Sequence, residues 1–273
     1  MFTVNTKKCV GCGRCVKDCF ATDIEMIGGK AHIKNEACIK CGHCIAICPK
    51  DAVSTDEYSM KDVLPYDKKD FEIDADTLLN FIKFRRSVRQ FKDKEVSEKK
   101  ILKIIEAGRF TQTARNLQEV SYTVVKDSLR VLEGLALESL KAKGEFILGD
   151  ENLKDEQLKR YAASWIKMYQ HFQESTDKKG GLFFNAPLVI VVSSNSDVNG
   201  SLASSNMELM ADALGLGTFF SGFFVRASKG DKKIRDFLEI KEGQEIVTCM
   251  VIGYPDVKYH RTVPRKEAEV VWK

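Results

Sequence analysis

Residues 9–19 read Cys-Val-Gly-Cys-Gly-Arg-Cys-Val-Lys-Asp-Cys, and residues 38–49 read Cys-Ile-Lys-Cys-Gly-His-Cys-Ile-Ala-Ile-Cys-Pro. Both stretches contain the spacing C-x2-C-x2-C-x3-C, and the second repeats the first at an offset of 29 residues. Three thiolates spaced three residues apart on a tight loop can reach three corners of one iron–sulfur cube, while the fourth points toward another cube. The repeat therefore predicts two [4Fe–4S] clusters.

Residues 1–55 resemble bacterial two-cluster ferredoxins. The resemblance implies crossed ligation, in which the last cysteine of each run binds the cluster of the other run. The two ligand sets are then Cys9, Cys12, Cys15 and Cys48 for one cluster, and Cys19, Cys38, Cys41 and Cys44 for the other. Phe20 stands where the second run has Pro49, but that proline only turns the chain away from the cluster. We therefore expect this segment to transfer electrons.

Two other uses of eight cysteines fit the pattern less well. A disulfide framework suits a short secreted chain, and no charged segment followed by an apolar one precedes Cys9. Structural zinc sites place their ligand pairs on knuckles that longer stretches separate. Neither alternative accounts for two uninterrupted runs of four cysteines.

The composition is typical of a soluble globular protein, because 44% of the residues are hydrophobic and 30% are charged. The formal net charge is +4, but that count leaves the cysteines neutral. Eight bound thiolates would make the loaded protein nearly neutral or acidic, so we expect no nucleic-acid partner. The longest apolar run, residues 187–192, is too short to span a bilayer. Exposed clusters favour the reducing cytoplasm of an anaerobe.

Composition and periodicity divide the chain into residues 1–55, a polar connector at 56–74 and a larger domain at 75–273. In the first part, Gly28-Gly29 between two apolar stretches predicts a β-hairpin. In the larger domain, helices are expected at 78–82, 97–105, 127–141, 151–174, 197–214 and 229–238, and strands at 120–125, 187–193 and 245–252. The fold class is therefore α+β, with a small ferredoxin-like domain followed by a second α+β domain.

The sequence Arg-Arg-Ser-Val-Arg at residues 85–89 is the most informative stretch of the larger domain. Guanidinium groups bind phosphate through paired, charge-assisted hydrogen bonds, and a serine hydroxyl adds a donor. The stretch alone is equally typical of a solvated basic patch. Further motifs follow it: Arg-Asn-Leu-Gln at 115–118, Leu-Gly-Leu-Gly at 214–217, Phe-Phe-Ser-Gly-Phe at 219–223 and Pro-Arg-Lys at 264–266.

The order of these motifs over residues 78–273 resembles the FMN-dependent nitroreductase family. The resemblance implies that the flavin carries the chemistry, and it gives no separate catalytic residue. It also implies a homodimer. The implied FMN contacts are Arg85, Arg86, Ser87 and Arg89 with Arg261 and Arg265 at the phosphate and ribityl, Asn116 at the ring edge, and Phe220, Ser221 and Gly222 along the ring.

Two departures from the family pattern bear on the pocket. Some relatives have a glutamate where Ser221 stands, and a frequent Pro-Trp is replaced by Glu119-Val120. The second change alters the pocket rim rather than FMN binding. We expect Phe219-Phe220 and the loop at 174–181 to decide whether the space above the flavin is closed or open.

Other candidate sites are weaker. Gly215-Leu216-Gly217 follows a helix and lacks the third glycine of a dinucleotide-binding motif, and the chain has no Walker A sequence. The four histidines (His32, His43, His171 and His260) show no metal-binding spacing. Cys249 is expected to be a buried small hydrophobe. Phe184 remains a candidate for the pocket, although aromatic residues at this spacing more often belong to the core.

These features predict an oxidoreductase that passes electrons from two [4Fe–4S] clusters through FMN to a two-electron acceptor such as a nitroaromatic, a quinone or an activated alkene. The electron donor would be ferredoxin or NAD(P)H. A second hypothesis is an electron-transfer module between ferredoxin and a protein partner, with nitro reduction as a side activity. A reductive dehalogenase or a flavin reductase is a third, weaker reading.

Overall fold

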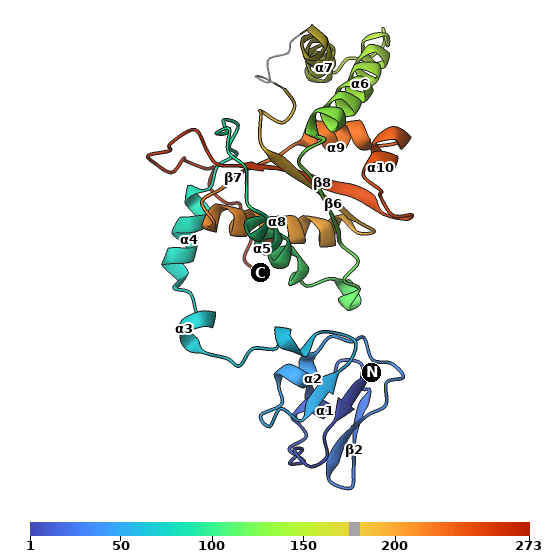
Figure 1. The fold of residues 1–273 in the computed structure, drawn as a ribbon, viewed down its shortest axis with the longest axis vertical. Helices are drawn as coiled ribbons and strands as arrows, with labels where there is room; N and C mark the ends of the chain where they lie inside the picture. Colours follow the sequence, from blue (N-terminus) through green and yellow to red (C-terminus); the bar gives the residue numbers. More distant parts are fainter. Residues whose placement is uncertain (175–180) are drawn as a thin grey trace. The chain divides into compact units, whose positions relative to one another are not determined.

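The computed structural model of the protein describes residues 1–174 and 181–273 (Figure 1). The chain forms two compact units. The first comprises Met1–Asp74 with Ala114–Leu117, and the second comprises Ala75–Thr113 with Gln118–Lys273. Within the described ranges, no helix combines the length and the apolar character that crossing a bilayer requires.

The first unit contains two small antiparallel ribbons. Strand β1 (Phe2–Val4) pairs with β4 (Val53–Thr55), and β2 (Ile24–Ile27) pairs with β3 (Lys30–Ile33). Gly28 and Gly29 connect β2 to β3 with φ angles of 55° and 76°, a left-handed conformation that glycine adopts at no steric cost. The predicted hairpin is therefore present. Two short helices, α1 (Arg14–Asp18) and α2 (His43–Ala46), lie within the two cysteine runs.

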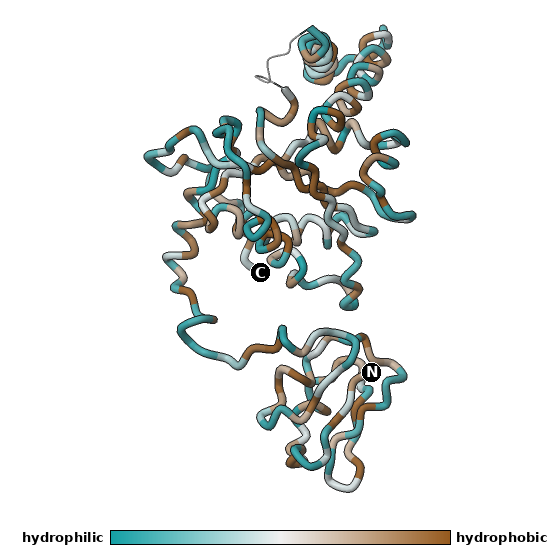
Figure 2. The backbone as a smooth tube through the Cα atoms, in the orientation of Figure 1, coloured by the Kyte–Doolittle hydropathy of each residue, from teal (hydrophilic) through white to brown (hydrophobic). Residues whose placement is uncertain are grey.

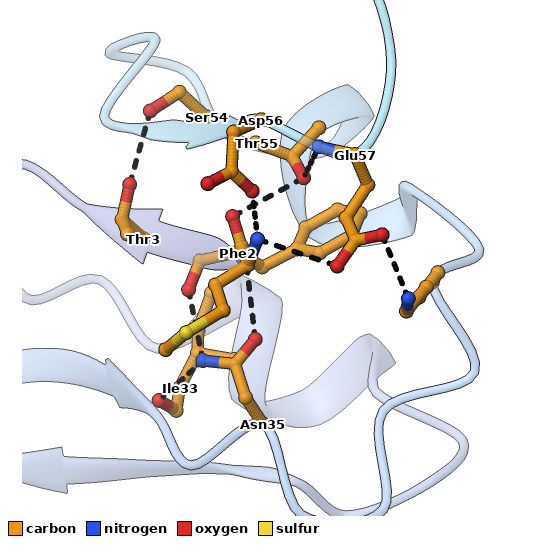
Figure 3. Close-up of polar contacts among 10 residues, drawn as sticks. Phe2, Thr3, Ile33, Asn35, Ser54, Thr55, Asp56 and Glu57 are labelled. Atoms are coloured by element: carbon orange, nitrogen blue, oxygen red, sulfur yellow. Dashed lines mark hydrogen bonds and ion pairs between the residues drawn. The ribbon is translucent and has the colours of Figure 1, made fainter.

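The core of the first unit is small and includes the cysteines. Phe2, Ile24, Ala31, Ile33 and Val53 are buried together, and six of the eight repeated cysteines pack against them. Figure 3 shows Asn35 between the N-terminal strand and β3. Asn35 accepts a hydrogen bond from the Phe2 backbone N–H at 2.9 Å and donates to the Phe2 and Ile33 carbonyl oxygens at 3.0 and 3.2 Å. One amide side chain thus ties both ribbons together.

The polar connector expected at residues 56–74 contains two short helical turns. These are the 3-10 turn η1 (Met60–Asp62) and helix α3 (Lys68–Phe71), and each begins at a side chain that accepts a backbone N–H. Neither turn buries a residue, which agrees with the polar composition of the segment.

The second unit is built on a four-stranded antiparallel sheet in the order β5-β6-β8-β7. The strands are β5 (Ser121–Val125), β6 (Leu188–Ser194), β8 (Glu245–Gly253) and β7 (Gly217–Phe220). All seven residues of the central strand β6 are buried. Figure 2 shows the hydrophobic colour concentrated along β6 and β8, as expected for strands covered on both faces.

Alternate residues of the central strands serve two separate cores. Val189 and Val191 of β6 pack with helices on one face, while Leu188, Ile190 and Val192 pack on the other. Helices α5 (Glu98–Arg109) and α8 (Asp197–Ala213) cover the second face. Helices α6 (Leu129–Leu148), α7 (Glu156–Glu174), α9 (Gly222–Ser228) and α10 (Lys232–Phe237) belong to the first. Figure 1 shows this three-layer arrangement within the unit.

The helix and strand predictions hold with specific exceptions. Helix α4 (Ala75–Phe84) begins before its predicted start, and α6 runs to Leu148, beyond the expected end at 141. Ser97 occupies the N-cap position of α5, but its side chain makes no capping hydrogen bond. The sequence interpretation missed β7 and α9, which together occupy only a dozen residues around Ser221.

Candidate functional site

The eight repeated cysteines line two cavities in the first unit. One cavity has Cys9, Cys12, Cys15 and Cys48 in its wall. The other has Cys19, Cys38, Cys41 and Cys44 in its wall. Each wall combines three cysteines of one run with the last cysteine of the other run, which is the arrangement that crossed ligation requires.

The chemistry of these cysteines fits iron–sulfur ligation. All nine cysteines of the chain lie in described residues, and each is a free thiol. Burial, together with the nearby thiols of Cys38 and Cys41, raises the pKa of Cys44 to about 12, so its sulfur becomes a thiolate only beside a strongly cationic partner. Backbone N–H groups of Ala31 and Gly11 lower the pKa of Cys9. Such N–H···S contacts also tune cluster potentials.

The spacing of these thiols differs from that of a single-ion site. Within residues 1–174 and 181–273, no three His, Cys, Asp or Glu side chains gather closely enough to share one metal ion. The thiols instead lie around the walls of two cavities, four to each cavity. A [4Fe–4S] cube has four iron atoms, each with its own cysteine ligand, so the four thiols lie around the cube and do not converge on a single ion.

Two features of the backbone hold the cysteine loops in place. Gly11 has a φ of 70°, and an added Cβ would lie 2.2 Å from the Gly29 carbonyl oxygen, so only glycine fits beside the hairpin. Asp23 is 1% exposed and accepts backbone N–H bonds from Asn35, Glu36 and Ala37 at 2.8–3.1 Å. Burial works to raise the pKa of Asp23, but these three bonds outweigh it and hold the pKa below its usual value.

In the second unit, three of the predicted FMN-binding arginines meet at one cavity. Arg85, Arg86 and Arg265 line a cavity of about 560 Å³, together with Lys83 and Thr262. Within the described residues, Arg85 Nε and Arg86 Nη2 are buried and lack a hydrogen-bond partner. Buried donors of this kind cost free energy unless a ligand accepts their hydrogen bonds. The cavity therefore suits an anionic group such as a phosphate.

Helix α8 supplies acidic partners that the sequence interpretation did not identify. Glu208 forms an ion pair with Arg85 through Nη1, and both side chains are 20% exposed. Thr218 Oγ1 donates to the other oxygen of Glu208 at 3.4 Å. Burial and the Glu208 charge raise the pKa of Asp212 to about 7, against the opposing effect of Arg85. Glu208 thus pairs with Nη1 of the Arg85 guanidinium, and the Nε–H of Arg85 remains able to donate to another acceptor.

The rest of the arginine-rich motif runs beside β7. Ser87 forms an isolated parallel β-bridge with Thr218. The neighbouring Val88 N–H donates to the Thr218 carbonyl oxygen at 2.8 Å. The Arg89 guanidinium lies 4.4 Å from the centre of the Phe219 ring, and that ring meets Phe184 edge to face at 5.3 Å. The motif therefore leads from the arginine cavity toward the Phe-Phe-Ser-Gly segment.

That segment joins β7 to α9. Phe220 ends β7, Ser221 is the N-cap of α9 and accepts the Phe224 N–H at 3.4 Å, and Gly222 begins the helix. The Ser221 backbone N–H already donates to the Cys249 carbonyl oxygen at 2.9 Å. Gly222 is exposed and lines a separate cavity of about 720 Å³.

Two further predicted FMN contacts, Asn116 and Arg261, also lie outside the arginine cavity. Asn116 belongs to the first unit, in the turn η2 (Ala114–Asn116), and its Nδ2 donates to the carbonyl oxygens of Ile39 and Lys40 at 3.2 and 2.9 Å. Arg261 is exposed in the C-terminal segment, where no regular element is formed. The roles of both residues toward FMN stay predictions. Part of the 174–181 loop lies outside the described residues.

Glu119, noted as a departure from the family pattern, has a defined environment. Its Oε1 accepts hydrogen bonds from Ser194 Oγ and Asn199 Nδ2, both at 2.8 Å. Burial favours a raised pKa, but these bonds outweigh it and lower the pKa of Glu119. Cys249 is fully buried, as predicted, and burial raises the pKa of its thiol.

Comparisons with known proteins agree with both halves of the sequence interpretation. The nitroreductase family model matches residues 82–254, and a 4Fe-4S dicluster domain model matches residues 1–49. A protein from Pseudomonas putida named 4-nitrobenzoate reductase is 30% identical over 192 residues, which cover 63% of this chain and 82% of that relative.

Solved structures show the same fold. A nitroreductase with bound FMN from Bacteroides fragilis matches with a TM-score of 0.51 and 20% identity, covering 71% of this chain and 98% of that one. A BluB-like flavoprotein from Clostridium difficile 630 matches with a TM-score of 0.53 and 20% identity, covering 70% and 94%. The predicted α+β fold class is thereby confirmed. The chain belongs to the nitroreductase family, carries a 4Fe-4S dicluster domain at its N-terminal end and is an oxidoreductase.

Proposed function

We propose that this protein passes electrons from two [4Fe–4S] clusters through FMN to a small-molecule, two-electron acceptor. The observation that carries the proposal is the pairing, in one chain, of two four-cysteine cavities with an arginine cavity whose buried N–H groups lack acceptors. Bound FMN supplies the conversion between one-electron delivery and two-electron release.

The chain's own residues would bind and orient the flavin. Arg85 Nε and Arg86 Nη2 donate to the phosphate, and Arg265 adds charge from the C-terminal segment. Glu208 orients the Arg85 guanidinium before the phosphate binds, so the Arg85 side chain loses less conformational freedom when FMN binds. Ser87 and Arg89 follow the path along β7 toward Phe220, Ser221 and Gly222, where the ring would lie. Because Ser221 N–H is already bonded, Gly222 N–H is the candidate donor to the ring.

The electrons balance in this scheme. A nitroaromatic takes up two electrons and two protons, becomes a nitroso compound and releases one water. Two reduced clusters store two electrons, which is enough for one such reduction. Nitroaromatics stand first among the expected acceptors because the relative from Pseudomonas putida is named for reducing one; quinones and activated alkenes need the same electron count.

Three further parts of the proposal concern the setting of the reaction. Residues 1–55 act as a fused donor domain, joined by 56–74 to the flavin domain at 75–273, so the local donor concentration is high without a collision between proteins. The protein is reduced again by ferredoxin at the clusters or by NAD(P)H at the flavin. The working form is a cytoplasmic homodimer.

A stoichiometric titration tests the proposal. Protein loaded with both cofactors is reduced, freed of excess reductant and mixed anaerobically with a quinone. It should reduce about twice as many quinone molecules per chain as protein loaded with FMN alone, because the clusters hold two further electrons. Equal yields would exclude the route from the clusters to the acceptor. Quinone reduction by clusters without FMN would favour the electron-transfer module.

A further inference from the structure

The cavity that Gly222 lines is separate from the arginine cavity and has its own chemistry. It is an open cavity of about 720 Å³ among α6, α7 and α9. Its lining includes aromatic and basic side chains: Phe146, Trp165, Lys143, Arg226 and Lys229. This size accommodates a small aromatic molecule with several substituents.

The charged side chains among the described residues that line this cavity are all positive. Among the described residues that line it, three are basic and none is acidic. Lys143 is already committed, because its Nζ donates to the carbonyl oxygens of Arg226, Ala227 and Lys229 at 2.7–2.9 Å and so caps the C-terminal end of α9. Arg226 and Lys229 make no ion pair with any described residue. Their charges are therefore available to an anionic ligand.

Trp165 gives the cavity an aromatic wall with an unused donor. The side chain is fully buried, and its ring meets Phe223 edge to face at 5.6 Å. Its Nε1 has no hydrogen-bond acceptor within the described residues. The Arg226 guanidinium lies 5.4 Å from the centre of the Trp165 ring. The guanidinium lies over the ring face, so the buried Trp165 ring positions Arg226 at the cavity wall through a cation–π contact.

Gly222 links this cavity to the flavin. It is the last residue of the Phe220–Gly222 segment, along which the ring would lie, and it is also part of the cavity wall. This step rests on the proposed function. An acceptor in the cavity would then reach the flavin without crossing another part of the protein.

We propose that this cavity is the acceptor site and that it selects aromatic acceptors bearing a carboxylate. Arg226 is the specificity-determining residue, because its N–H groups pair with the carboxylate while the aromatic ring packs against Phe146, which is exposed in the same cavity wall. Lys229 adds a second positive charge at the same wall.

The test compares two nitro compounds that differ by one carboxylate, 4-nitrobenzoate and nitrobenzene. In Arg226→Gln, the ratio of their kcat/KM values should fall by about tenfold, the effect of one charge-assisted hydrogen bond at a partly exposed site. Lys229→Gln should lower the ratio less, and Arg226→Lys should retain part of it. The matched control is Arg130→Gln, because Arg130 of α6 also lies over an aromatic ring, that of Phe172 of α7 at 4.1 Å, but does not line the cavity.

Benzoate, which is not reduced, gives a second readout by calorimetry on the loaded protein. Its dissociation constant should rise about tenfold in Arg226→Gln and stay unchanged in Arg130→Gln. An unchanged ratio and unchanged benzoate binding in Arg226→Gln would overturn the inference, even if both nitro compounds are reduced. If neither compound is reduced while benzoate binding still depends on Arg226, the proposed function fails and the anion site stands. Lys229→Gln keeps the test valid if Arg226→Gln does not fold.

Discussion

The Arg85→Lys substitution tests the phosphate site with the positive charge retained. Lysine can still neutralise Glu208, but it lacks the planar fork and the Nε–H that is buried without a partner. If that N–H donates to the FMN phosphate, its loss removes one hydrogen bond to a charged group, worth about 1.5–3 kcal/mol. The FMN dissociation constant should then rise about 10- to 150-fold.

Riboflavin provides the internal comparison, because it has the same ring and ribityl chain but no phosphate. Flavin binding is measured by fluorescence titration of the protein with each ligand. Riboflavin affinity should change less than about threefold in Arg85→Lys. Arg109→Lys is the matched control, because Arg109 also forms a fork with a carboxylate, that of Glu106 at 2.7 and 2.8 Å, but on the exposed side of α5. Equal weakening of FMN and riboflavin, or no weakening of either, would refute the phosphate assignment.

Three other predictions concern the clusters and the acidic partner. Cys48→Ser should damage the cluster of Cys9, Cys12 and Cys15, because Cys48 shares their cavity; iron counts and EPR should show the other cluster intact, and its selective loss would contradict crossed ligation. Asp23→Asn should speed cluster loss to an iron chelator by about tenfold, because charge-assisted bonds that hold the segment before Cys38 are weakened; an unchanged rate would remove Asp23 from the cluster's support. Asp212 has its pKa raised to about 7, so the folded protein binds a proton that the unfolded chain releases above pH 4, and this contribution to stability is lost as pH rises through 7. Asp212→Asn should therefore raise the Tm more at pH 8 than at pH 5, and thermal melts that show the same shift at both values would contradict the burial argument.

The cluster site could be predicted from the sequence because its ligands lie in two short, regular runs. The spacing within each run is local, and the repeat gives the crossed arrangement once a ferredoxin-like fold is assumed. The structure places the expected four cysteines in the wall of each cavity. Asp23 was not identified, because its three partners lie 12 to 14 residues away and a lone aspartate carries no periodic signal.

Helix ends were harder to predict where glycine serves packing rather than termination. Helix α6 was expected to end near residue 141, yet it continues through Gly144 to Leu148. Gly144 is buried, and an added Cβ would lie 2.8 Å from the Ala162 carbonyl oxygen of α7. The glycine therefore permits close approach of two helices, and its sequence context alone does not distinguish that role from a helix stop.

In the flavin site, too, residues with a local sequence signal could be predicted, whereas residues that the fold brings together could not. The arginines at 85 and 86 stood out by charge, and the late arginine by its place in the family pattern. Glu208 had no such signal, because its pairing with Arg85 arises only when α8 packs beside the segment that follows α4. The only local hint was its place four residues before Asp212, since like charges at that spacing on a helix repel unless a cation lies nearby. The acceptor cavity likewise forms from residues that lie up to 87 positions apart, from Ala142 to Lys229.

The most direct test of the electron route is an anaerobic stopped-flow experiment on protein loaded with iron, sulfide and FMN. The clusters are reduced first, the protein is mixed with 4-nitrobenzoate, and the cluster and flavin absorbance bands are followed separately. The account predicts that the clusters reoxidise at the rate at which the acceptor is consumed, and that this reoxidation slows strongly in protein without FMN. Clusters that stay reduced while FMN turns over with NAD(P)H would contradict it.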